Sequence, residues 1–240
     1  MNLELCLPSE HIITGGRKIP FFKKFYGQNV EQMPKLIADG RVPMSVAQLM
    51  QRRLVLKNYD DTVESSYRDN YFDTGDAVVY HPDGRVKIVF DALPLREMTP
   101  KSRLNNGRLI LTNDIYDSLQ GEEFKYGELG KINCFLSKKE VKAHPVWRVL
   151  LRHPDNVPSE LAISGLLEES VDYIFAEGKE RFGYDAMMGV YPDSASDEVE
   201  MRAWVVNGLE GRSFALGRIY LDCGTGLFIG IAPEATQFFW

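Results

Sequence analysis

The chain has 240 residues and a formal net charge of −6, with 44% hydrophobic and 26% charged residues. These proportions are typical of a soluble globular protein and exclude a disordered or fibrous chain. No run of about 18 apolar residues occurs, and the first residues lack the basic and apolar segments of a secretory signal. We therefore expect no membrane contact and a cytoplasmic location.

The amino-terminal segment 14–27 mixes basic and aromatic residues. Its basic residues are Arg17, Lys18, Lys23 and Lys24, and its aromatic residues are Phe21, Phe22, Phe25 and Tyr26. Such a segment can stack nucleic-acid bases on its rings while its cations neutralise phosphates. The alternative is structural: the rings anchor a loop to the core, and the lysine stems lie along the surface.

Two helices are predicted next, over residues 30–38 and 46–54. Ser45 starts a capping box, and the apolar residues that follow it repeat at helical intervals. Two helices joined by a turn also fit a helix-turn-helix, in which Arg52 and Arg53 would contact bases or phosphates. The alternative is an ordinary amphipathic helix, since every such helix has a polar face.

Residues 76–92 carry the clearest local signal, that of a β-hairpin. Two runs rich in β-branched and aromatic residues flank the sequence His-Pro-Asp-Gly. Pro82 presets φ at about −65°, and Gly84 accepts a positive φ, which suits a tight turn. A lone hairpin is only marginally stable in water, so we expect other elements to cover it.

The middle of the chain alternates short strands with helices. We expect strands over residues 108–111 and 131–136, and helices over residues 113–119, from Ser137 to the interruption at His144 and Pro145, and over 146–153. The longest helix is predicted over 159–182, where the apolar residues form one stripe.

The last quarter is predicted to be rich in strands. These strands cover residues 189–191, 200–206, 213–220 and 227–232, and Gly-rich turns separate them. The simplest arrangement is an antiparallel meander. In the strand over 200–206 we expect Met201, Ala203 and Val205 to face the core, with the polar residues Glu200 and Arg202 on the other face.

Together these elements predict an α+β protein. Its antiparallel sheets, the hairpin near 76–92 and the meander over 189–232, would pack with a few helices. We expect an amino-terminal region over residues 1–145 and a region with the long acidic helix and the meander over 146–240, with a single domain as the alternative. Residues 238–240 are all aromatic, and we expect them to dock on the protein's own surface or on a partner.

Charge is distributed unevenly along the chain. Residues 1–57 hold nine Lys or Arg against four Asp or Glu, whereas residues 155–200 hold two against twelve. Because no catalytic signature is present, this separation favours a non-catalytic binding or interaction protein, with nucleic acid or another protein as its partner. The candidate nucleic-acid contacts are Arg17, Lys18, Lys23, Lys24, Arg52 and Arg53.

The alternative function is a metal-dependent, nuclease-like hydrolase. Glu168 and Asp172 are four residues apart and share a helix face, and Asp185 follows the end of that helix. Three such carboxylates would hold Mg²⁺ or act as acid and base, although a solvated, charge-balanced helix face explains the same residues. No short ligand spacing occurs among the four histidines or the three cysteines, so the sequence itself predicts no metal site and no cofactor.

Overall fold

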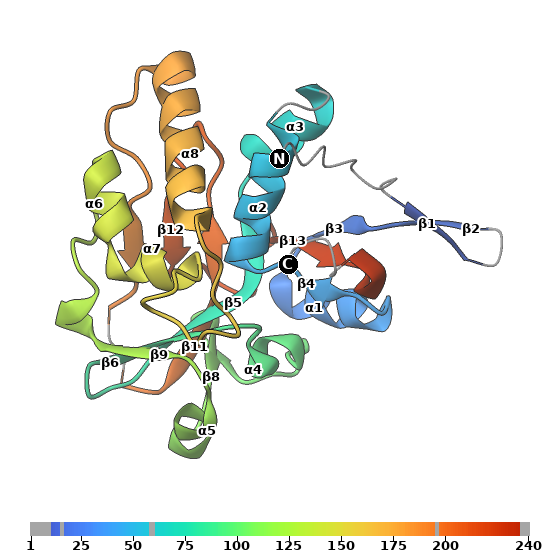
Figure 1. Cartoon of the computed structure of the whole chain (residues 1–240). Helices are drawn as coiled ribbons and strands as arrows, with labels where there is room; N and C mark the ends of the chain where they lie inside the picture. The colour runs from blue at the N-terminus through green and yellow to red at the C-terminus, as the bar shows by residue number, and fades with distance from the viewer. Residues whose placement is uncertain (1–10, 15–16, 58–60, 195–196, 236–240) are drawn as a thin grey trace.

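The computed structural model describes residues 11–14, 17–57, 61–194 and 197–235, without the side chains of 11–19 and 61. Its elements form a twisted sheet with helices packed on both faces (Figure 1). The aromatic residues 238–240 lie outside this range, so their expected docking stays a prediction. No helix of the described residues is long and apolar enough to cross a membrane.

The helices are mostly short. They are α1 (Asn29–Ala38), α2 (Val46–Leu56), α3 (Asp61–Arg68), α4 (Leu93–Arg96), α5 (Asn113–Ser118), α6 (Lys138–Ala143), α7 (Pro145–Leu150) and α8 (Leu166–Phe182), with a 3-10 turn η1 (Tyr126–Glu128). The strands are β1 (His11–Thr14), β2 (Arg17–Pro20), β3 (Phe22–Tyr26), β4 (Val42–Pro43), β5 (Phe72–Tyr80), β6 (Arg85–Val89), β7 (Leu104–Asn105), β8 (Arg108–Ile110), β9 (Glu122–Lys125), β10 (Val190–Pro192), β11 (Glu200–Val206), β12 (Ala215–Gly217) and β13 (Leu227–Ile231).

The main sheet of the described residues has eleven strands, and its longest path runs β10-β12-β11-β5-β13-β3. Most neighbouring strands are antiparallel; β10 with β12 and β13 with β5 are parallel pairs. Strands β1 and β2 form a separate hairpin. The α+β class predicted from the sequence is therefore confirmed, and strands from both sides of residue 145 share this sheet.

The predicted hairpin is present as β5 and β6. Their register runs from Ala77 opposite Val89 to Tyr80 opposite Val86, and Gly84 in the turn has a φ of 90°. All nine residues of β5 are buried, because the strand lies between β11 and β13 and helices cover both of its faces. The hairpin thus supplies the centre of the sheet rather than an edge.

Two hydrophobic clusters lie on opposite faces of the sheet. On one face Val78, Tyr80 and Trp204 pack against α2, α6, α7 and α8. On the other face Ala77 and Val79 pack with residues of α1 and α4. This alternation follows from the two-residue period of a strand. Helices α1 and α2 therefore lie on opposite faces with β4 between them, an arrangement that a helix-turn-helix does not have.

Three predicted elements differ in the structure. The long helix begins at Leu166 rather than at residue 159, because Gly165 precedes it with a φ of 81°. Residues 131–136 form only an isolated bridge between Leu136 and Met187, since Asn133 has a φ of 58° and cannot continue a strand. The four strands over 189–232 are present, but not as a meander: β13 lies beyond β5 and pairs with β3.

Candidate functional site

The basic pair on β3 is exposed, and both lysines already have partners. Lys23 Nζ lies 3.0 Å from Asp39 Oδ2, and Lys24 Nζ lies 2.5 Å from Ser66 Oγ. Arg17 and Lys18 belong to β2, and their side chains fall outside the described part of the chain. One of the two described lysines of this segment, Lys23, is therefore already paired with a carboxylate.

The two arginines of α2 are buried, with exposed fractions of 6% for Arg52 and 2% for Arg53. Arg52 lies over the rings of Phe22 and Tyr67, 4.3 and 5.3 Å from their centroids. Arg53 donates to the backbone carbonyls of residues 67, 70 and 207 at 2.9, 3.2 and 3.0 Å. Contact of Arg53 with a nucleic acid would require these three hydrogen bonds to break.

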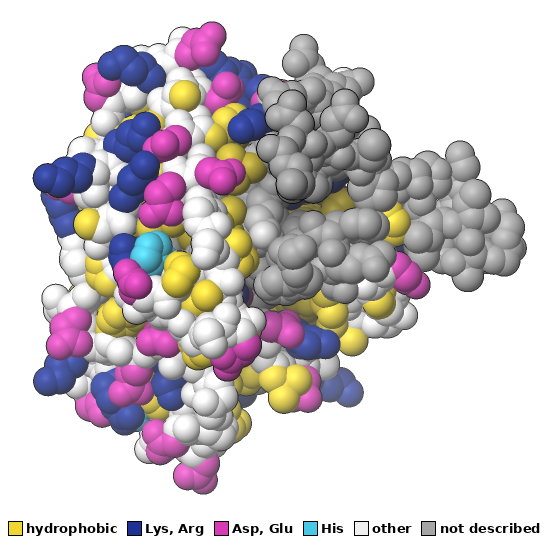
Figure 2. Space-filling model, viewed as in Figure 1, with side chains coloured by type: hydrophobic (Ala, Val, Ile, Leu, Met, Phe, Trp, Pro, Cys, Tyr) yellow, Lys and Arg dark blue, Asp and Glu magenta, His cyan; other side chains and the backbone are white. Residues whose placement is uncertain are grey.

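Opposite charges are interspersed on the molecular surface. In the part of Figure 2 that is not grey, Lys and Arg side chains lie next to Asp and Glu side chains, without a continuous basic region. The sequence-level separation of charge is therefore not reproduced on this face, because residues distant in the chain neutralise one another. One example is Arg181 of α8, which lies 3.1 Å from Asp69.

The three candidate catalytic carboxylates do not converge. Each has a basic neighbour of its own: Glu168 has His153 at 3.9 Å, Asp172 has Lys142 at 2.6 Å, and Asp185 has Lys179 at 2.9 Å. Hydrogen bonds from lysines, that of Lys142 foremost, lower the pKa of Asp172. Residues 172–182 of α8 alone rise about 15 Å, so Asp172, inside the helix, lies far from Asp185, which follows the helix end.

His144 and His153, nine residues apart in the sequence, each contact a different group of the protein. His144 is buried, its Nε2 lies 3.0 Å from the carbonyl oxygen of Lys131, and burial lowers its pKa. His153 Nδ1 lies 2.9 Å from Arg148 Nη2. The described residues contain no group of three or more His, Cys, Asp or Glu side chains that would hold a metal ion.

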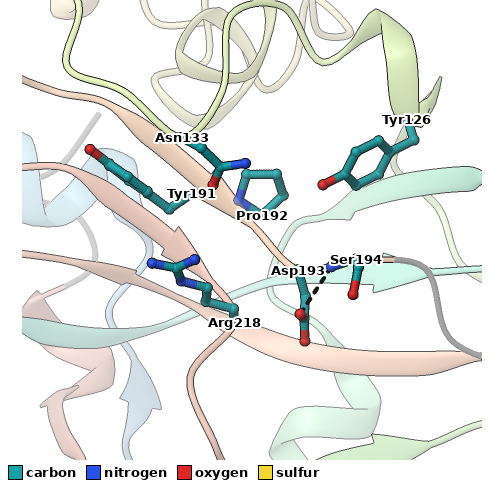
Figure 3. A pocket seen from close by; sticks show the side chains of 7 residues that line it. All are labelled: Tyr126, Asn133, Tyr191, Pro192, Asp193, Ser194 and Arg218. Atoms are coloured by element: carbon teal, nitrogen blue, oxygen red, sulfur yellow. Dashed lines mark hydrogen bonds between the residues drawn. The ribbon is translucent and has the colours of Figure 1, made fainter.

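An open pocket of about 440 Å³ lies beside β10, at the end of the sheet opposite β3. It is lined by Tyr126, Asn133, Tyr191, Pro192, Asp193, Ser194 and Arg218 (Figure 3). Tyr126 lies on one side of the pocket, and Tyr191 with Arg218 on the other. These residues come from η1, the loop before α6, the end of β10 and the segment after β12, so no local sequence motif marks the pocket.

A buried charged network holds the pocket's backbone. Arg202, which is 1% exposed, donates to Asp193 Oδ2 at 2.5 Å and to the carbonyl of Arg218 at 3.0 Å. Arg108 reaches the same Asp193 oxygen at 3.2 Å. The hydroxyl of Tyr80 accepts from the Asp193 backbone N–H and donates to the Gly217 carbonyl, both at 2.9 Å. Both ends of the pocket are thus fixed to the central strands.

Sequence reasoning missed this network because it placed Glu200 and Arg202 on an outward face. Both side chains are 1% exposed, and Glu200 pairs with Arg108 at 2.9 Å. Buried charges need partners, and these partners come from distant segments that the sequence does not associate. The sequence does hold one signal for this network: Glu200 and Arg202 are two residues apart in an otherwise apolar strand, on the same face as Trp204.

The mouth of the pocket differs from its base in hydrogen bonding, because the polar side chains at the mouth have no partner among the described residues. Within the described residues, the side chains of Tyr126, Asn133, Tyr191 and Arg218 form no hydrogen bond or ion pair, and Arg218 has only a ring contact with Tyr191, at 5.5 Å. The guanidinium group of Arg218 extends toward Tyr191 and away from the Asp193 carboxylate (Figure 3). Burial, and secondarily the charge of Asp193, raise the pKa of Tyr126, so its hydroxyl stays protonated at neutral pH.

Comparison with known proteins identifies the fold. No family model matches the chain, and no curated protein matches it. A solved structure described as "Accommodation of massive sequence variation in Nanoarchaeota by the C-type lectin fold" superposes with a TM-score of 0.62 and 13% sequence identity, over 88% of this chain and 97% of that one. The chain therefore has an α+β, C-type lectin-like fold.

Proposed function

We propose that this protein is a non-catalytic binding protein whose ligand occupies the pocket beside β10. One observation carries the proposal: the hydroxyls, amide and guanidinium at the pocket mouth are unpaired within the described residues, while the charged side chains beneath them are ion-paired with one another. Binding sites typically combine a few convergent polar groups with aromatic walls on a rigid support. The C-type lectin-like scaffold supplies that support.

The free groups indicate a polar ligand with hydrogen-bond acceptors and a negative charge. Arg218 offers a forked guanidinium that suits a carboxylate. Asn133 and the two tyrosine hydroxyls add donors that can also accept. The Asp193 carboxylate does not add a free negative charge to the pocket, because Arg202 and Arg108 already contact one of its oxygens. The net charge of the open groups is therefore positive.

The chemistry of the pocket favours binding over catalysis. Ser194 carries a hydroxyl beside an acid there, and its backbone N–H, at 2.9 Å, is what contacts Asp193. An activated serine needs a base within hydrogen-bond reach of its hydroxyl, and the described residues that line this pocket include no histidine. Nucleic acid has weaker support than a smaller polar ligand, because the described cations predicted to contact it have partners in the protein or are buried.

A thermal-shift panel tests this function. Succinate, citrate, glucuronate, glutamate and glucose, each at 5 mM, are compared by the melting temperature of the whole chain, since a ligand held by the folded state raises it. We expect at least one acid of the panel to stabilise the protein, and Tyr126→Ala and Asn133→Ala to remove the shift. Tyr26→Ala is the matched control, because Tyr26 is 63% exposed on β3.

Two results would contradict the proposal. One is that no compound of the panel changes the melting temperature. The other is a shift of equal size in wild type, Tyr126→Ala and Asn133→Ala, which would place binding elsewhere on the molecule.

A further inference from the structure

A row of stacked aromatic and arginine side chains extends from the pocket toward the carboxyl end of α8. We call it the arginine strip; it consists of Phe135, Tyr184, Tyr191, Arg212, Phe214 and Arg218. Arg212 lies between two rings, 4.5 Å from the centroid of Phe135 and 4.1 Å from that of Tyr184. The centroids of Phe135 and Tyr191 are 6.0 Å apart, and Arg218 lies over Tyr191. The contacts are therefore continuous from the helix end to the pocket.

The backbone holds Arg212 in this position. Arg212 and Ser213 have φ values of 60° and 49°, in the left-handed region that non-glycine residues rarely adopt. The Met188 N–H donates to the Arg212 carbonyl at 2.8 Å, and Met188 itself has a φ of 47°. Unfavourable backbone conformations of this kind concentrate at functional sites. The backbone that carries Arg212 is thus fixed by the contact with Met188.

The two arginines of the strip have no carboxylate partner within the described residues, unlike most other arginines of the protein. Ten arginines of the described residues form an ion pair with a carboxylate, namely Arg41, Arg68, Arg85, Arg96, Arg103, Arg108, Arg148, Arg152, Arg181 and Arg202. Arg212 and Arg218 form none within those residues; Arg212 donates to the Ala186 carbonyl at 3.3 Å. A carboxylate from outside the chain can pair with each of them.

We propose that the arginine strip is a docking surface for an acidic segment of another protein, with one carboxylate on Arg218 and a second on Arg212. The inference rests on the proposed function, because Arg218 belongs to the pocket. Aromatic residues and arginine are enriched at protein interfaces and dominate their binding energy. The rings of Phe135 and Phe214 provide the apolar contact between the two charged positions.

A nucleic-acid strand fits the strip less well. A phosphate backbone requires several cations along its path, and the strip has two. Exposed acids border it as well: Glu210 is two residues from Arg212, and Asp185 follows Tyr184. These acids repel a continuous polyanion, whereas a protein segment can place its few carboxylates on the arginines alone.

The test selects peptides against the whole chain. A displayed library of random 12-residue peptides is panned, the enriched peptides are synthesised, and their Kd values are measured by fluorescence anisotropy at 0.15 M salt. We expect enrichment of Asp and Glu, and a Kd at least ten-fold higher for Arg212→Gln and for Arg218→Gln. Arg181→Gln and Lys179→Gln are the controls, since both side chains are exposed near the same helix end and outside the strip, and they should leave the Kd within two-fold. Unchanged near-ultraviolet circular dichroism confirms that each variant is folded.

The outcomes separate this inference from the proposed function. Failure to enrich any peptide, or enrichment without an acidic bias, overturns the docking surface. Loss of binding in Arg218→Gln and Tyr126→Ala, but not in Arg212→Gln, also overturns it and leaves the pocket as the binding site. Unchanged binding in all three variants also overturns the docking surface, and the thermal-shift panel then decides separately on the pocket. Tighter binding of a 20-nucleotide oligothymidine than of any peptide, dependent on both arginines, would assign the strip to nucleic acid instead.

Discussion

Arginines lie over aromatic rings at several places in this protein, and two of these places are near the opposite ends of the sheet. Beside β3, Arg52 lies over Phe22 and Tyr67, and Arg53 follows it in the core. Beside β10, Arg212 lies between Phe135 and Tyr184. The residue types are the same, but Arg53 donates to three backbone carbonyls, whereas Arg218 donates to no group of the described chain.

The difference shows that hydrogen-bond satisfaction, rather than composition, separates a structural arginine from an available one. A buried guanidinium needs acceptors for its N–H groups, and Arg53 finds three of them in backbone carbonyls of separate segments. Removing such an arginine leaves carbonyls unpaired inside the protein. Removing a surface arginine without a partner leaves nothing unsatisfied.

The largest expected effect follows from Arg53. Arg53→Gln removes the buried cation and leaves carbonyls of residues 67, 70 and 207 without their donor, which should lower the free energy of unfolding by about 3–5 kcal/mol. Arg218→Gln should change it by less than about 0.5 kcal/mol. Urea titration followed by circular dichroism measures both values. Equal destabilisation by the two substitutions would remove the distinction between the regions.

The buried carboxyl of Asp73 offers a second test of how hydrogen-bond partners affect a buried charged group, because its two partners are uncharged. Asp73 on β5 is 1% exposed and accepts from the Asn29 amide at 2.8 Å and the Leu227 N–H at 2.6 Å. Burial raises the pKa of Asp73 to about 6, above the value of about 3.9 in an unfolded chain. The stabilising contribution of its protonated form is therefore fully present below about pH 4 and is lost as the pH rises through about 6, a change of about 2–3 kcal/mol.

Asp73→Asn removes this titration while keeping the shape of the side chain. We expect the variant to gain stability relative to wild type between pH 4 and pH 7.5, measured by urea unfolding at both values. Asp39→Asn is the control of opposite sign, because hydrogen bonds from Arg41 and Lys23 lower the pKa of Asp39. Its contribution is present at neutral pH and lost as the pH falls. The same pH dependence in Asp73→Asn and wild type would rule out Asp73 as the source.

The smallest expected difference compares the two stacked arginines. Arg52→Ala should cost about 2 kcal/mol, since a desolvated cation–π contact is stronger than an exposed one. Arg212→Ala should cost about 1 kcal/mol or less, because the Arg212 side chain is only half-buried. Thermal unfolding of both variants at one pH measures the order. A larger loss for Arg212 would assign it a structural role and weaken the docking surface.

Much of the fold follows from local patterns in the sequence. The hairpin of β5 and β6 and the capping box at Ser45 were predicted correctly because turn chemistry and capping act over three or four residues. The position of β13 beyond β5 was not predicted, since strand order depends on which hydrophobic faces meet in space. Asn133 likewise ended a predicted strand through a left-handed φ that no neighbouring residue signals.

The candidate site was harder to predict than the fold. Its residues lie between positions 126 and 218 and meet only after β10, β11 and β12 pair. The sequence drew attention to charge totals and to cations such as Arg52 and Arg53, which the structure shows to be buried. Whether an arginine is paired depends on residues far away in the chain, so composition alone could not select Arg212 and Arg218.

Side-chain nuclear magnetic resonance of the arginines tests the central claim most directly. A dodecapeptide of alternating glutamate and tyrosine is added to the whole chain, and the Nε–H signal of each arginine is followed. The account predicts that the Arg212 and Arg218 signals shift, while those of Arg53 and Arg202 stay in place. Shifts at Arg103 or Arg181 as large as those at Arg212 and Arg218, or no shift at either strip arginine, would contradict it.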